Sequence, residues 1–168
     1  MKHKHFFTLI STVGLLLALS LSAAAQSDTQ KNFDKLKTLA GSWDGTFQDT
    51  PVHVTLRVTS RGNTLMHEMT SSGPDDPITM ITVDGDQLRL THYCDAGNQP
   101  HMVGTVSPDG KTITFNFVDA TNLLPSQGGH MQRATFTFID ADHHSEKWEF
   151  AMADGNLMGG VLDLKRSK

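Results

Sequence analysis

The clearest structural pattern in the chain is Val52-His53-Val54-Thr55-Leu56-Arg57-Val58-Thr59. Apolar side chains occupy every second position of this stretch, and polar side chains occupy the positions between them. Because successive side chains of a strand point to opposite faces, the alternation predicts a β-strand with one buried face and one solvated face.

The same alternation recurs along most of the chain on both sides of this stretch. Turn-forming pairs such as Asp84-Gly85 and Asp109-Gly110 separate the alternating runs and are typical of tight hairpins. Ten strands joined by short turns close most readily into an antiparallel up-and-down β-barrel, which has no exposed sheet edge. A two-sheet sandwich is the alternative that the pattern leaves open. Besides 52–59, we expect strands over about 42–48, 63–71, 77–84, 86–94, 101–107, 111–118, 129–139, 142–151 and 156–165.

One short helix precedes the strands. Phe33, Leu36, Leu39 and Ala40 are spaced three or four residues apart, and Gly41 follows them as a stop signal. We therefore expect an all-β domain with one short N-terminal helix over residues 31–168, preceded by a flexible leader over residues 26–30.

The first 25 residues are predicted to be a signal peptide. Lys2 and Lys4 precede an apolar run, and Ala23 and Ala25 supply the small side chains that cleavage before Gln26 requires. No cysteine follows the apolar run to accept a lipid. We expect a periplasmic or secreted protein that has no membrane partner after cleavage.

The charge of the mature chain limits the classes of partner that we expect. Loss of the two signal-peptide lysines leaves 12 basic and 18 acidic residues, a net charge of −6. Nucleic acids and anionic membranes select basic surfaces, so neither is expected as a partner. Cys94 is the single cysteine, which excludes an intrachain disulfide. The sequence leaves the oligomeric state open.

The opening of the first strand resembles that of lipocalins and other calycin barrels. This resemblance rests on Leu39-Ala40-Gly41-Ser42-Trp43-Asp44-Gly45, a short helix leading into a Gly-x-Trp motif. In calycins a basic residue of the last strand packs over the tryptophan, and the resemblance implies that role for Lys165 or Arg166. The Gly-x-Trp-x-Gly form is also similar to nitrobindin-like ten-stranded barrels.

A narrower resemblance covers nearly the whole mature chain. The motif His92-Tyr93-Cys94 followed by Gly97-Asn98-Gln99-Pro100, together with 117–123 and Gly129-His130-Met131, resembles a group of exported bacterial proteins of unknown function. It implies a barrel fold and an extracytoplasmic location, and no assigned activity.

Strand parity identifies candidate site residues. Alternation places four histidines, His67, His92, His130 and His144, on the same faces as apolar residues of four different strands, and Glu146 shares the face of His144. Cys94 shares the face of His92, and the polar loop that follows it contributes Asn98 and Gln99. A lone inward histidine is more often a hydrogen-bonded core residue, but four on different strands favour a shared cavity.

The leading hypothesis is therefore a binding protein that holds a small, partly apolar molecule inside the barrel, rather than an enzyme. Its expected ligand-binding residues are His67, His92, Cys94, Asn98, Gln99, His130 and Glu146. Asn98 has a second interpretation, as the cap of its own turn. No catalytic residue and no cofactor are assigned.

Two alternatives belong to other functional classes. A metal or haem site would draw on the soft ligands His92, Cys94, His101, Met102, His130 and Met131. Nitrobindin-like proteins hold haem iron with a histidine of a late strand, whereas residues 150–168 here contain no histidine. An enzyme would pair Cys94 with His92 or His130, or Glu146 with His67 or His144.

Overall fold

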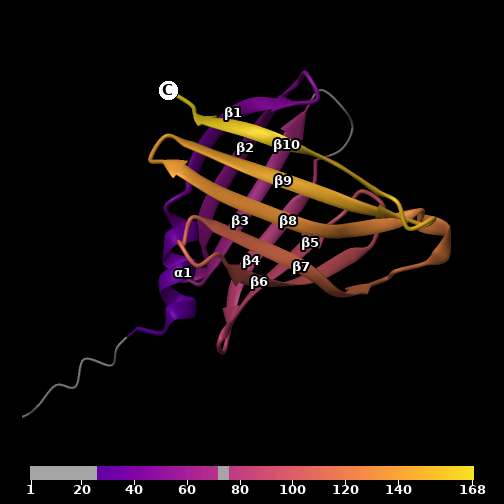
Figure 1. Cartoon of the computed structure of the whole chain (residues 1–168), viewed down its shortest axis with the longest axis horizontal. Helices are drawn as coiled ribbons and strands as arrows, with labels where there is room; N and C mark the ends of the chain where they lie inside the picture. The colour runs from indigo at the N-terminus through magenta and orange to yellow at the C-terminus, as the bar shows by residue number, and fades with distance from the viewer. Residues whose placement is uncertain (1–25, 72–75) are drawn as a thin grey trace, which may run out of the picture.

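The structure, a computed structural model, describes residues 26–71 and 76–168. The predicted signal peptide, residues 1–25, lies outside the described residues. The described chain forms a closed barrel of ten antiparallel strands, as the alternating pattern predicts, and the two-sheet sandwich is excluded. Figure 1 shows the barrel with its one α-helix beside it.

Each strand of the barrel pairs with its neighbours in sequence, and the last strand pairs with the first. The register between the first and last strands places Trp43 opposite Arg166 and closes the barrel. The strands are β1 (Gly41–Phe47), β2 (Thr50–Thr59), β3 (Thr64–Ser71), β4 (Ile78–Asp84), β5 (Gln87–Tyr93), β6 (Gln99–Val106), β7 (Thr112–Thr121), β8 (Gly129–Asp140), β9 (His143–Met152) and β10 (Leu157–Arg166). Two short 3-10 helices, η1 (Ser60–Gly62) and η2 (Pro125–Gln127), lie in the connections.

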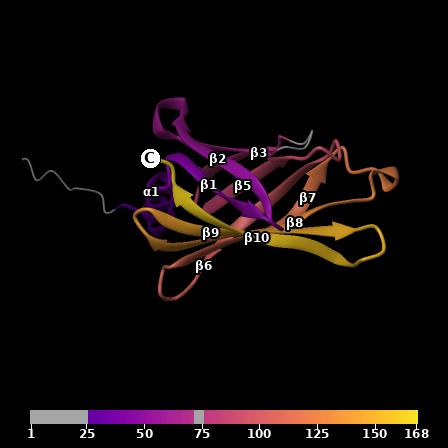
Figure 2. The ribbon, with the colours of Figure 1, turned by 90° about the horizontal axis from the view of Figure 1, so that it is seen from above.

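The helix α1 (Asp28–Lys37) closes one end of the barrel. Phe33 and Leu36 are buried in the same hydrophobic core as the inward side chains of the strands. Thr29 donates a hydrogen bond to the Asp86 carbonyl in the β4–β5 turn, and Lys35 donates to the Gly110 carbonyl in the β6–β7 turn. The helix is therefore anchored to the turns at this end (Figure 2).

The helix begins earlier than its apolar spacing indicates. The Ser27 hydroxyl accepts a hydrogen bond from the Gln30 amide and caps the N-terminus, so the helix includes Asp28, Thr29 and Gln30. The flexible leader that the sequence predicts over residues 26–30 therefore overlaps the helix at these three residues. The serine cap is the signal that the apolar spacing alone does not show.

Trp43 is the centre of the closed end. Its side chain is fully buried, and its indole N–H donates to the Leu39 carbonyl at 2.8 Å. The Arg166 guanidinium lies 4.1 Å from the centre of the indole ring and also donates to the Ala40 carbonyl. Arg166, rather than Lys165, thus takes the position over the tryptophan that the calycin resemblance implies.

The turn of the β1–β2 hairpin lacks the glycine or asparagine that marks such turns in a sequence. Phe47 pairs with Thr50, so Gln48 and Asp49 form a two-residue turn. Their φ angles are 47° and 65°, in the left-handed region that tight hairpins require and that glycine or asparagine usually supplies. The turn places Gln48 at the barrel end opposite α1.

No helix in the described part of the chain combines the length and the apolar character that crossing a bilayer requires.

Candidate functional site

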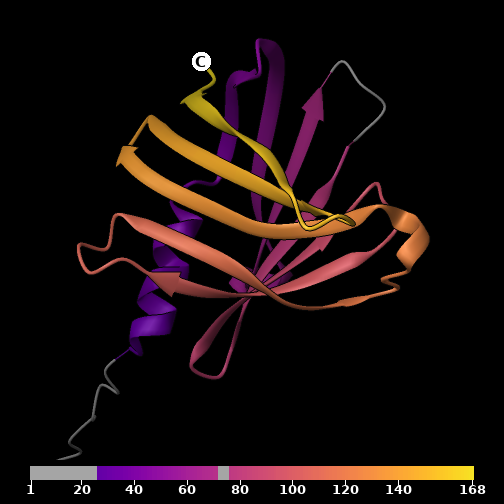
Figure 3. The same ribbon diagram turned by 45° about the vertical axis from the view of Figure 1, so that its right-hand side comes forward.

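The barrel contains a cavity of about 330 Å³ at the end away from α1. Its lining includes Gln48 in the β1–β2 turn, Pro77 before β4, Asp95 after β5 and Met158 at the start of β10. These residues lie in or next to the connections at one end of the up-and-down barrel, whereas α1 is anchored at the opposite end (Figure 3). The volume lies within the range of about 300 to 1,000 Å³ that is usual for small-molecule pockets.

Six aromatic and methionine side chains contribute to the cavity wall. They come from β1, β3, β8, β9 and β10, so the pairing of distant strands brings them together. They are Phe47, Met69, Met131, Trp148, Phe150 and Met158. The polar lining residues are Gln48, His67, Thr79, His92, Cys94 and Asp95.

His92 is the buried polar residue of the wall with an accessible ring nitrogen. It is 3% exposed, and its Nδ1 is hydrogen-bonded to the Thr79 hydroxyl at 2.9 Å. Burial is the main reason why the pKa of His92 is lowered to about 4; the charge that His67 carries when protonated acts in the same direction, and Asp95 opposes it. His92 is therefore neutral near pH 7.

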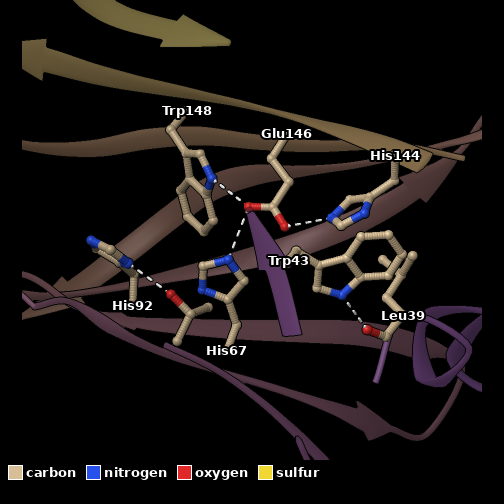
Figure 4. Close-up of polar contacts among 8 residues, drawn as sticks. Leu39, Trp43, His67, His92, His144, Glu146 and Trp148 are labelled. Atoms are coloured by element: carbon tan, nitrogen blue, oxygen red, sulfur yellow. Dashed lines mark hydrogen bonds and ion pairs between the residues drawn. The ribbon is translucent and has the colours of Figure 1, made fainter. Parts of the chain in front are cut away.

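Glu146 lies behind the cavity wall and is fully buried. Its Oε2 accepts hydrogen bonds from His67 Nε2 at 2.9 Å and from Trp148 Nε1 at 3.0 Å, and its Oε1 accepts from His144 Nε2 at 3.0 Å. Figure 4 shows the three donors around the carboxylate. We call these four residues the Glu146 cluster. It joins β3 to β9 across the barrel interior.

The charge of Glu146 is stabilised by its partners. Complete burial alone would raise the pKa of this carboxyl, but the charges and hydrogen bonds of His67 and His144 outweigh burial and lower the pKa. The Nδ1 atoms of both histidines are buried without a hydrogen-bond partner in the described part of the chain. An ionised carboxylate can only accept hydrogen bonds, so Nε2 of each histidine carries a proton that faces Glu146.

The cluster is continuous with both ends of the barrel. His144 packs edge-on against Trp43, with ring centres 4.2 Å apart. On the other side, Trp148 lies between His67 and His92, with 5.4 Å between its ring centre and that of each histidine. A substitution in the Glu146 cluster should therefore shift Trp148 and, with it, the cavity wall.

The structure brings together part of the set expected from sequence. His67, His92 and Cys94 line the cavity, and Glu146 bonds directly to the lining residues His67 and Trp148. Cys94 is partly exposed, and its Sγ donates to the Asp95 carboxylate at 3.5 Å.

His130 is not among the residues that line the cavity, so the structure does not bring it together with His92. A β-bulge between Met131 and Arg133 reverses the alternation in this part of β8. Met131 faces the cavity instead. The ring of His130 stacks on Phe117, with ring centres 4.0 Å apart.

Asn98 and Gln99 also lie away from the cavity lining. Asn98 is buried and donates hydrogen bonds to the Gly129 carbonyl and to the Gln127 side chain. These hydrogen bonds connect the β5–β6 loop to the start of β8. Asn98 thus neither lines the cavity nor caps its own turn. Gln99 donates to the Gly97 carbonyl.

The residues considered for a metal or haem site do not converge. His101 bonds to Asp119, whereas Met102 is buried in the core. Among the described residues, no group of three or more His, Cys, Asp or Glu side chains is arranged to hold a metal ion. β10 contributes Met158, Gly159 and Leu162 to the cavity and no histidine. These residues do not fit the haem arrangement that the nitrobindin resemblance implies.

Comparisons with known proteins bear on the fold alone. No protein-family model matches the chain, and no curated protein matches it. The crystal structure of Rv2717c from M. tuberculosis is similar, with a TM-score of 0.57 and 17% identity over 82% of this chain and 98% of that one. A protein of unknown function from the DUF3598 family of Nostoc punctiforme has a TM-score of 0.51 and 13% identity. That match covers 79% of this chain, which spans about half (49%) of the Nostoc chain. At these identities the likeness establishes a shared barrel architecture.

Proposed function

We propose that the protein binds a small, largely apolar molecule in the barrel cavity, and that it does so outside the cytoplasm after removal of residues 1–25. The cavity itself is the observation that carries this proposal. Protein cores are normally packed without voids larger than a water molecule. A space of about 330 Å³ whose lining includes three aromatic and three methionine side chains is the form of a binding site.

The wall supports binding of an apolar molecule over binding of a polar one. Met69, Met131 and Met158 contribute flexible, polarisable side chains that adapt to the shape of a ligand. Trp148 is held in place by its hydrogen bond to Glu146 and provides a rigid aromatic surface. The site thus combines one rigid aromatic side chain with three flexible methionine side chains.

Native mass spectrometry of the protein isolated from the periplasm tests the proposal. We expect a co-purifying organic mass, with intact mass on the same sample showing an N-terminus at or within a few residues of Gln26. The variant Met69→Trp fills the cavity and should lose the bound mass. Thr70→Trp is the matched control, because Thr70 is exposed on the other face of β3. Equal retention by both variants would place the bound molecule elsewhere.

A further inference from the structure

The cavity wall presents one buried histidine nitrogen that is available to a ligand. His92 uses Nδ1 to bond Thr79, and its Nε2 makes no hydrogen bond within the described part of the chain. Unlike Nδ1 of His67, this Nε2 is not sealed from solvent. Figure 4 shows Nε2 of His92 on the side of the ring turned away from Glu146. The Thr79 hydroxyl can donate or accept, so Nε2 can serve as either acceptor or donor.

The charges around the cavity are unfavourable for an anion. Asp95 lies at the rim, and Glu146 lies behind His67 and Trp148 with its charged form stabilised. No lysine or arginine is among the described residues that line the cavity. His92 itself stays neutral, since burial lowers its pKa to about 4. His67 directs Nε2 to Glu146 and its Nδ1 is sealed from solvent, so a carboxylate brought into this site would lose its hydration without gaining a hydrogen-bonded cationic partner.

The apolar part of the wall favours flat, aromatic groups. Trp148 and Phe150 from β9 and Phe47 from β1 line the cavity on the two strands that flank β10, and three methionines line it with them. Aromatic rings gain from ring contacts and from sulfur–aromatic contacts beyond the area that they bury.

We propose that the ligand is an uncharged aromatic molecule whose single hydroxyl or amino head hydrogen-bonds to Nε2 of His92, and that the site rejects the corresponding carboxylate. This inference rests on the proposed function and specifies the chemistry of its ligand. A hydroxyl head suits the site in either tautomer of His92, because it can donate to or accept from Nε2.

Three matched probes test the inference: naphthalene, 2-naphthol and 2-naphthoate share one ring system and differ in the head. Each is titrated near neutral pH as a competitor of the uncharged fluorophore N-phenyl-1-naphthylamine. We expect 2-naphthol to bind at least about tenfold more tightly than 2-naphthoate, because the carboxylate is desolvated without a partner. We also expect 2-naphthol to bind more tightly than naphthalene.

Two variants connect this preference to named residues. His92→Phe should weaken 2-naphthol by about fivefold, the effect of one lost hydrogen bond, and leave naphthalene unchanged. Asp95→Asn, at an exposed position, should strengthen 2-naphthoate with no change for 2-naphthol. Asp86→Asn makes the same charge change in the β4–β5 turn, at the closed end, and should leave all three affinities unchanged.

The outcomes separate the two proposals. If neither the fluorophore nor any naphthalene probe binds, the proposed function fails and this inference fails with it. If naphthalene or 2-naphthoate binds as tightly as 2-naphthol, or if Asp95→Asn does not favour 2-naphthoate, the cavity binds ligands and the inference about their head group is wrong.

Discussion

Replacing Glu146 is the most informative perturbation of the barrel interior. Glu146→Ala leaves three buried N–H donors, on His67, His144 and Trp148, without their acceptor. Each unpaired buried donor costs about 1 to 3 kcal/mol. We therefore expect the free energy of unfolding to fall by at least about 3 kcal/mol, within the range of about 3 to 5 kcal/mol typical when one partner of a buried ion pair is removed.

Glu146→Gln separates hydrogen bonding from charge. The amide oxygen can still accept from His67 and Trp148, while its NH₂ group faces Nε2 of His144. His144 then has to move its proton to Nδ1, where it has no partner in the described part of the chain. One unpaired donor predicts a loss of about 1 to 3 kcal/mol, clearly less than that of the alanine variant.

Guanidinium denaturation followed by tryptophan emission measures these losses, and an unchanged m-value confirms that the two states are comparable. Glu149→Ala is the control on the same strand. The Glu149 side chain is 12% exposed, but its partners Lys147 and Arg133 are 50% and 41% exposed and stay hydrated when the carboxylate is removed, so its loss should cost less than about 1 kcal/mol. Equal losses for Glu146→Ala and Glu149→Ala, or for the alanine and glutamine variants at 146, would refute the reasoning.

Three further predictions address other parts of the molecule. The pKa of His92 is 6.5 in the unfolded chain and about 4 in the folded state, so the unfolded state binds a proton first as the pH falls. Between these two pH values the free energy of unfolding of wild type should therefore fall by about 3 kcal/mol more than that of His92→Phe, as measured by denaturation at each pH. Asp49→Gly should stabilise the β1–β2 turn by about 0.5 to 1 kcal/mol, because glycine adopts its φ of 65° without strain, and a lower melting temperature would contradict this. Trp43→Ala should cost about 3 to 5 kcal/mol in the same denaturation assay, and a loss below about 1 kcal/mol would show that Trp43 does not hold the closed end.

The sequence predicts the barrel well because strand alternation and hairpin turns are local signals. The two-residue turn after Asp84 pairs that residue with Gln87, and counting back along both strands pairs Thr79 with His92. The hydrogen bond between these two side chains could therefore have been predicted from the turn alone.

The errors arise where the period of two is broken. One extra residue in β8 turns His130 away from the cavity and Met131 toward it, and no residue near Gln132 announces the bulge. The pairing of Glu146 with His67 or His144, one of the alternatives that the sequence leaves open, is present for both histidines; the contact with His67 depends on closure of the barrel between strands distant in sequence. Gln48 was missed because its turn contains no glycine.

Titration with N-phenyl-1-naphthylamine decides whether the barrel cavity is a binding site. Wild type and the Thr70→Trp control should each bind one molecule per chain with affinities that agree within about twofold, and Met69→Trp should bind at least about tenfold more weakly because its side chain occupies the cavity. No saturable binding to wild type, or equal affinity for wild type and Met69→Trp, would contradict the claim.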